Sequence, residues 1–104
     1  MAEVELLWWD GCPSTEKALS AVRGVLADEG LDPDAVVMRE VSTDEDAERE
    51  RFVGSPTIRI GGIEVAPVEG EPVGLSCRVY RLRDGRISPV PDTEDIRDAV
   101  RRAR

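Results

Sequence analysis

The stretch Trp8-Trp9-Asp10-Gly11-Cys12-Pro13-Ser14-Thr15 separates an apolar run from a helical pattern, and it decides the fold of the N-terminal half of the chain. Before it, residues 4–9 (VELLWW) are almost all apolar, as in a strand covered on both faces. After it, apolar residues recur at helical spacing, namely Ala18, Leu19, Val22, Val25 and Leu26. We therefore predict a strand, a turn that holds Cys12, and a helix that ends near Gly30.

The chain after this unit continues to alternate between strand and helix patterns. Residues 35–41 (AVVMREV) predict a second strand, and Ser42-Thr43 followed by acidic residues predicts a short capped helix to about residue 52. Residues 57–65 (TIRIGGIEV) predict a hairpin with Gly61-Gly62 at its turn. This order indicates an α/β fold with parallel strands joined by a crossover helix and an antiparallel edge.

The last third of the chain begins with a loop rich in proline and glycine, residues 66–77. Residues 78–90 then predict a second hairpin with Asp84-Gly85 at its turn. Asp92-Thr93 predicts the cap of a final helix. The apolar positions of that helix are Ile96, Ala99, Val100 and Ala103. No internal repeat or linker interrupts this order, so we expect one domain over residues 1–104.

Composition and charge exclude several classes of function. The net charge of −8 repels phosphate groups, so we expect neither nucleic acid nor a membrane surface as a partner. The chain has no histidine, which removes the usual general base and the commonest metal ligand. We predict no cofactor, and any chemistry is left to thiols, carboxylates, arginines and backbone dipoles.

The first residues do not resemble an export signal, because MAEVELLWW contains two glutamates and no basic region. No apolar run approaches the ~18 residues needed to cross a bilayer. We therefore expect a cytoplasmic protein, in a compartment where thiols stay reduced. In that setting the two cysteines, Cys12 and Cys77, favour a catalytic, metal-binding or buried role over a permanent disulfide.

Two motifs and the order of elements resemble the thioredoxin-like superfamily. One motif is the stretch around Cys12, between the first strand and the first helix, and the other is Gly54-Ser55-Pro56-Thr57, directly before the hairpin. The resemblance implies a thioredoxin-like three-layer α/β/α sandwich with a mixed sheet. It also implies a cis Ser55–Pro56 peptide bond that faces the active thiol.

Two features depart from the superfamily pattern. Thr15 stands where the dithiol motif has its second cysteine, so Cys12-Pro13-Ser14-Thr15 is closer to the monothiol variants. Residues 78–90 would form an extra C-terminal β-hairpin before the last helix.

The resemblance implies a thiol–disulfide oxidoreductase that acts on a disulfide or thiol of a protein or a small molecule. Cys12 is then the nucleophile, Cys77 is the candidate for the resolving thiol, and Asp10 is the candidate proton shuttle. Extended substrates are expected along the backbone just before Thr57. The residues expected to line the substrate site are Trp9, Gly11, Pro13, Ser14, Thr15, Ser55, Pro56 and Thr57.

A cysteine at a helix start is favoured as a thiolate, because the unpaired amides of the first turn point toward its sulfur. Pro13 suits the first helical position, where its missing N–H costs nothing. Ser14 and Thr15 add hydroxyl donors. Asp10 opposes this effect, because a nearby carboxylate disfavours a second anion.

Three other interpretations stay open. Cys12, Cys77 and Asp10 also suit a soft ion such as mercury, with two thiols to hold the metal and an acid to protonate carbon, a set of residue types similar to that of organomercurial lyases. The chain also fits a non-catalytic interaction module that keeps the fold without the chemistry. Finally, either cysteine fits a small buried residue with no chemical role.

Overall fold

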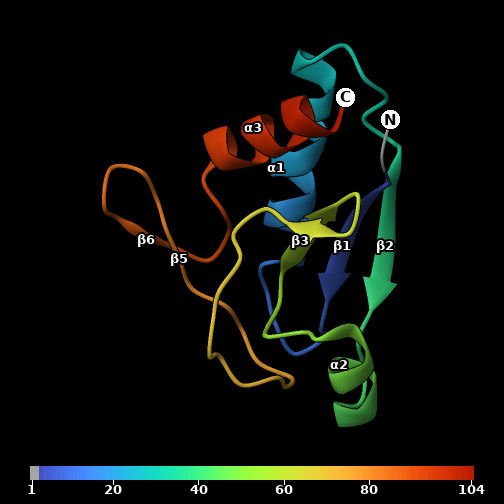
Figure 1. The fold of residues 1–104 in the computed structure, drawn as a ribbon, viewed down its shortest axis with the longest axis vertical. Helices are drawn as coiled ribbons and strands as arrows, with labels where there is room; N and C mark the ends of the chain where they lie inside the picture. Colours follow the sequence, from blue (N-terminus) through green and yellow to red (C-terminus); the bar gives the residue numbers. More distant parts are fainter. Residues whose placement is uncertain (1–2) are drawn as a thin grey trace.

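The computed structural model describes residues 3–104, which form a mixed four-stranded sheet, three helices and a separate two-stranded sheet (Figure 1). The elements are β1 Val4–Trp8, α1 Thr15–Asp28, β2 Val36–Glu40, α2 Asp44–Glu50, β3 Thr57–Ile60, β4 Ile63–Glu64, β5 Tyr80–Arg81, β6 Ile87–Ser88 and α3 Thr93–Ala103. The predicted α/β class and the predicted alternation of strands and helices are confirmed.

The four-stranded sheet is built around β1, which lies between β2 and β3 in the order β2-β1-β3-β4. β1 and β2 pair in parallel, with Leu6 opposite Met38, because α1 returns the chain to the same end of the sheet. β1 and β3 pair antiparallel, and β3 turns through Gly61-Gly62 into the short edge strand β4. The predicted parallel pair and the predicted antiparallel edge are therefore both present.

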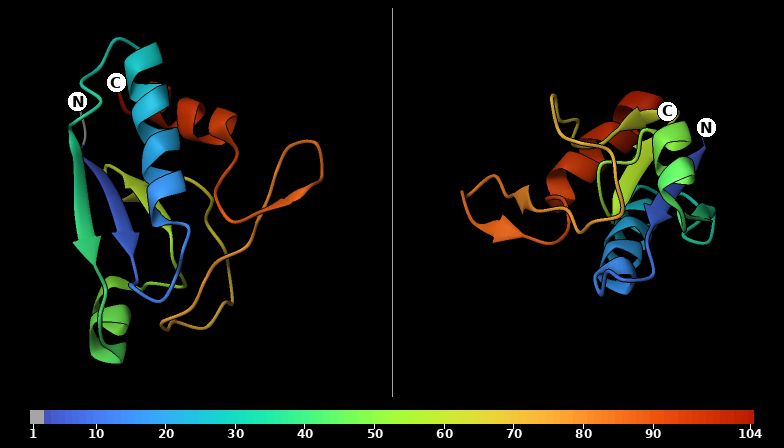
Figure 2. Two further views of the ribbon diagram at one scale, coloured as in Figure 1. Left: turned by 180° about the vertical axis from the view of Figure 1, so that it is seen from behind. Right: turned by 90° about the horizontal axis from the view of Figure 1, so that it is seen from below.

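The larger core lies between the sheet and the helices α1 and α3, which pack against each other (Figure 2). Val4 and Leu6 enter it from β1, because alternate residues of a strand point to the same face. Ile96 and Val100 enter it from α3. The predicted apolar stripe of α1 is buried here, and its members are Ala18, Leu19, Val22, Val25 and Leu26.

A smaller core lies on the opposite face of β1. Leu7 packs there with Val41, Ala47 and Phe52, while the half-buried side chains of Trp9 and Leu75 lie against them. Helix α2 supplies Ala47 and lies beyond the carboxyl ends of β1 and β2 (Figure 1). β1 is therefore covered on both faces, as its continuous apolar run predicts.

Two of the three helix starts follow their sequence signals. The Thr43 hydroxyl accepts a hydrogen bond from the N–H of Asp46 at 3.0 Å, and the Asp92 carboxylate accepts one from Glu94 at 2.9 Å. The expectation for α1 is wrong in detail, because this helix begins at Thr15 rather than at Pro13. Its first backbone bond runs from Ala18 to the carbonyl of Ser14, so Ser14 is the cap residue and Pro13 precedes the helix.

The segment after β4 crosses back over the molecule before it reaches α3 (Figure 1). Within it, β5 and β6 pair antiparallel, Tyr80 with Ser88 and Arg81 with Ile87, and they stand apart from the four-stranded sheet.

Within residues 3–104, no helix has both the length and the apolar character required to cross a membrane.

Phe52 provides a test of the smaller core. It is fully buried, so Phe52→Ala should lower the free energy of unfolding by about 3–5 kcal/mol through lost burial and the cavity left behind. Urea denaturation measures this change. Met38→Ala, on the exposed edge strand β2, is the control and should change stability by less than about 0.5 kcal/mol. Equal losses in the two variants would contradict this description of the core.

Candidate functional site

Cys12 lies in the turn that connects β1 with α1. Its backbone N–H donates to the carbonyl of Trp9 at 3.0 Å, which closes the turn through Asp10 and Gly11. The turn needs glycine at position 11, because a Cβ there would lie 2.4 Å from the indole ring of Trp9. Cys12 itself is buried, with 6% of its surface exposed.

The sulfur of Cys12 faces the loop before β3. Its thiol donates to the backbone carbonyl of Ser55 across 3.4 Å. The hydroxyl of Ser55 in turn accepts from the backbone N–H of Trp9 at 3.1 Å, which ends the pairing of β1 and ties the cysteine turn to the loop. The Ser55–Pro56 peptide bond is cis, as the resemblance predicts.

The second cysteine, Cys77, also lies next to Ser55, although it is far from Cys12 in the sequence. Ser76, Cys77 and Arg78, which we call the covering segment, lie beside Ser55 as an isolated parallel bridge. The N–H of Ser55 donates to the carbonyl of Ser76 at 2.7 Å, and the N–H of Arg78 donates to the carbonyl of Ser55 at 2.8 Å. Cys77 is exposed, and its thiol lies close enough to the sulfur of Cys12 for each thiol to shift the pKa of the other. Both cysteines are free thiols.

The environment shifts the two thiol pKa values in opposite directions. Burial raises the pKa of Cys12, but hydrogen bonds from the Cys77 thiol, from the N–H of Ser14 and from the Ser55 and Ser14 hydroxyls outweigh it, so that this pKa lies below its ordinary value. The hydrogen bond to Cys12, together with some burial, raises the pKa of Cys77 to about 11. Of the two thiols, Cys12 is therefore the one that loses its proton first as the pH rises.

Contrary to the sequence prediction, the backbone amide that lowers the pKa of Cys12 is not one from the first turn of α1. Cys12 lies before the helix rather than at its first position, and the amide that reaches its sulfur is that of Ser14, the cap residue of α1. The expected thiolate stabilisation is thus supplied by the cap residue, by neighbouring hydroxyls and by the second thiol.

The expected substrate groove along the loop before Thr57 is not open, which corrects the sequence prediction. Ser55, Pro56 and Thr57 are buried, and the covering segment already uses both backbone groups of Ser55. The reason is a long-range backbone pairing that residue types do not reveal. Ser55 contacts both cysteines, through the Cys12 thiol and through its bridge to Cys77, instead of presenting an edge to solvent.

The other predicted site residues surround Cys12 unevenly. Trp9 lies over Gly11, Ser14 contributes an N–H and a hydroxyl to the sulfur, and Pro13 is exposed beside it. The hydroxyl of Thr15 is buried and has no hydrogen-bond partner. Asp10 is exposed, so its carboxylate lacks the desolvation that a proton shuttle requires.

Arg78 and Tyr80 belong to the site, and the sequence reasoning missed both. Arg78 is buried, and its guanidinium donates to the Glu64 carboxylate at 2.5 Å and to the carbonyl of Ala66 at 2.7 Å. It also lies 4.5 Å from the centre of the Tyr80 ring, whose hydroxyl donates to the carbonyl of Pro56. Alternation in a hairpin gives no signal for a buried arginine, so no pattern identifies it.

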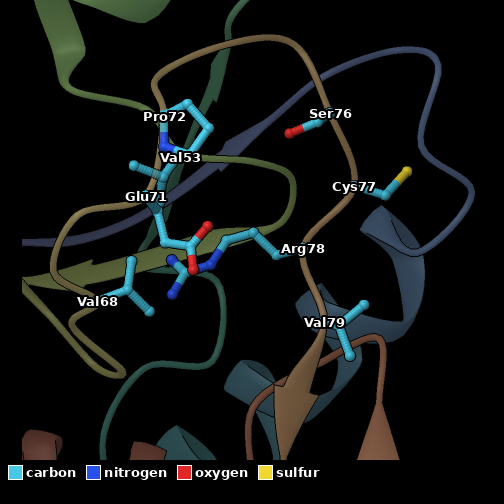
Figure 3. Close-up of a pocket in the computed structure, with 8 residues that line it drawn as sticks. All are labelled: Val53, Val68, Glu71, Pro72, Ser76, Cys77, Arg78 and Val79. Atoms are coloured by element: carbon cyan, nitrogen blue, oxygen red, sulfur yellow. The ribbon is translucent and has the colours of Figure 1, made fainter.

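A pocket of about 300 Å³ lies beside the covering segment, whose three residues are among those that line it (Figure 3). In Figure 3 the Arg78 side chain points toward Glu71 and Val68, whereas the Cys77 sulfur points away from them. This follows from the extended backbone, in which successive side chains point to opposite sides. Cys77 lines the pocket, but its sulfur is directed away from the side on which the Arg78 side chain lies.

The described residues contain no ready metal centre of three ligands. Among residues 3–104, no three cysteine, aspartate or glutamate side chains are grouped so as to hold a metal ion. The two thiols are adjacent, but Asp10 does not complete a triad with them.

Comparison with known proteins identifies no relative. The chain matches no protein-family model, no curated protein and no solved structure.

The hydrogen bond between the thiols predicts how each cysteine titrates without the other. Cys77→Ala removes a donor to the Cys12 thiolate and should raise the pKa of Cys12. Cys12→Ala should lower the pKa of Cys77 from about 11 toward 9.0. Thiolate absorbance in the ultraviolet, followed against pH, measures both. Ser76→Ala is the control and should leave both titrations in place; unchanged titrations in the cysteine variants would contradict the contact.

The close approach at Gly11 gives a second prediction for the cysteine turn. In Gly11→Ala the new Cβ collides with the Trp9 ring, so the ring must move out of its place against the smaller core. We expect a change in tryptophan fluorescence and a loss of stability of about 1–3 kcal/mol. Gly24→Ala, in α1 with open space around it, is the control and should be neutral or stabilising. Equal behaviour of the two variants would contradict the packing of Trp9.

Proposed function

We propose that this protein is a thiol–disulfide oxidoreductase in which Cys12 is the nucleophile and Cys77 the resolving thiol. The observation that carries the proposal is that both cysteines lie at Ser55, Cys12 through its thiol and Cys77 through the backbone bridge, with thiol pKa values shifted in opposite directions. A thiolate is the species that attacks disulfides, and a neighbouring protonated thiol stands ready to resolve the product.

The proposed reaction balances over two exchange steps. The Cys12 thiolate attacks a substrate disulfide, forms a mixed disulfide and releases one substrate thiolate. Cys77 loses its proton to this thiolate and attacks the Cys12 sulfur, which releases the second substrate thiolate. The dithiol of the protein is oxidised to a disulfide while the substrate disulfide is reduced to two thiols, and an external thiol reductant regenerates the protein.

We also propose a thioredoxin-like architecture for the fold. The order β1-α1-β2-α2-β3-β4 followed by α3 supports it, as does the mixed sheet with β1 parallel to β2 and antiparallel to β3. The place of Cys12 after β1, 3.4 Å from the carbonyl that precedes Pro56, supports it further. In this proposal β5 and β6 are the extra hairpin before the last helix.

A second candidate function is the binding of a soft metal ion by the two thiols. The observation in its favour is the same contact, because two adjacent thiolates suit an ion such as mercury(II). Because Asp10 is exposed, it does not favour an acid-assisted reaction on a bound organometal, and this candidate function is limited to binding. Binding would release protons and require both cysteines, whereas disulfide exchange proceeds without metal.

The redox proposal predicts a defined set of products. Treatment of the reduced protein with a small disulfide should yield one intramolecular Cys12–Cys77 disulfide, reversible by a dithiol reductant. Cys77→Ser should instead stop at a stable mixed disulfide on Cys12, because the resolving thiol is absent. Intact mass spectrometry distinguishes these species. Two thiols that react only after unfolding would refute the proposal and leave a non-catalytic module.

Asp10 provides a second test of the mechanism. General acid–base residues contribute about 10²–10⁴-fold to a rate, so loss of a proton shuttle would be obvious. Because Asp10 is exposed, we expect Asp10→Asn to change the rate of exchange by less than about threefold. Stopped-flow measurement of thiol release compares the rate of Asp10→Asn with that of the wild type, and Asp44→Asn on α2 is the control. A hundredfold loss would restore Asp10 as a proton donor.

A further inference from the structure

We propose that this protein exchanges disulfides with small molecules rather than with extended polypeptides, because its own covering segment occupies the backbone edge beside Cys12. The inference rests on the proposed function and names the substrate class of the same site.

The backbone groups that an extended substrate would need are already paired. An extended chain binds an exposed strand edge through alternating N–H and carbonyl groups. Beside Cys12 those groups belong to Ser55, and they bond with the carbonyl of Ser76 at 2.7 Å and the N–H of Arg78 at 2.8 Å. Cys77, between these two residues, is paired with Ser55 and so occupies the position that an extended substrate would need along this edge.

The covering segment is held in place by more than these two bonds. The guanidinium of Arg78 binds Glu64, the carbonyl of Ala66 and the hydroxyl of Thr57, and the Tyr80 hydroxyl binds the carbonyl of Pro56. The Arg78 side chain is almost fully buried, so these bonds are shielded from water. The segment is therefore part of the folded structure and not a loosely attached loop.

Close packing at Gly54 reinforces this arrangement. A Cβ at position 54 would lie 2.5 Å from the Cγ of Arg78, and the φ angle of +139° is one that other residues rarely adopt. Glycine at this position lets the covering segment approach the loop before β3 without a gap. An additional chain has no room between them.

The remaining approach to the thiols suits a compact reagent. Cys12 is 6% exposed, whereas Cys77 next to it is exposed. We expect a small disulfide to reach the thiols from the exposed side of Cys77 without displacing any backbone. A polypeptide with residues on both sides of its cysteine must first break the bonds of the covering segment, which slows its reaction with the Cys12 thiolate.

Two matched substrates test the proposal. One is the mixed disulfide of 2-mercaptoethanol with N-acetylcysteine methylamide, and the other is the same mixed disulfide at the centre of a flexible peptide about ten residues long. Each rate with the reduced protein is divided by the rate of the same substrate with free 2-mercaptoethanol, which removes differences in intrinsic reactivity. We expect the compact substrate to react at least about tenfold faster on this scale, because two backbone hydrogen bonds must open for the peptide.

Variants of the anchors should remove this preference. Arg78→Ala and the milder Tyr80→Phe loosen the covering segment, so the ratio of the two rates should fall toward one. Arg81→Ala, an exposed arginine on β5, is the matched control and should keep the wild-type ratio. Amide hydrogen exchange is the independent readout: the N–H groups of Ser55 and Arg78 should be protected in the wild type and lose protection in the anchor variants.

The outcomes separate the two proposals. Equal normalised rates in the wild type would overturn the substrate class and leave the oxidoreductase intact. Unprotected amides at Ser55 and Arg78 would overturn it as well, because the covering segment would then open freely. Failure of both substrates to react faster than with the free thiol would refute the oxidoreductase itself.

Discussion

The backbone pairing of Ser55 with the covering segment is the constraint on which the site depends. Together with the bond from the N–H of Gly74 to the carbonyl of Phe52, it joins the long loop after β4 to the loop before β3, where the Cys12 thiol contacts Ser55. Without it, Cys77 would belong to a stretch rich in proline and glycine with no defined position. The buried guanidinium of Arg78 maintains the pairing, since a buried charge is tolerated only where it is paired and hydrogen-bonded.

The chemistry of Cys12 follows from a balance between desolvation and hydrogen bonding. Burial alone would keep this cysteine protonated and unreactive. The structure offsets burial with donors from Cys77, Ser14 and Ser55, and the Cys77 thiol contributes most among them. The same contact raises the pKa of Cys77, so Cys12 loses its proton before Cys77 does.

The covering segment fixes the position of the second thiol and at the same time restricts the access of substrates to the site. The covering segment supplies the second thiol, and the same segment closes the edge along which an extended substrate would lie. Glu64 is a half-buried residue of the edge strand β4 and forms an ion pair with Arg78. This ion pair connects the β3–β4 hairpin with the site. The glycines at positions 11 and 54 are both places where a side chain would push the two sides of the site apart.

The sequence by itself determined the local elements and their order. The apolar run of β1, the stripe of α1, the turn at Gly61-Gly62 and the capping residues Thr43 and Asp92 are signals carried within a few residues, and each appears in the structure. Periodicity and capping are local properties of a chain, so a single sequence is enough to read them. The two cysteines were identified in the same way, by residue type and by their place between elements.

Only the tertiary structure decided how the site is built. The contact of Cys12 with Cys77, the burial of Arg78 and the occupied edge at Ser55 depend on pairings between segments far apart in the chain. The residues involved are ordinary loop and hairpin residues whose patterns allow many partners. Their partners are set by how the packed cores orient the loops, and that information lies in the assembled fold and not in any one stretch of sequence.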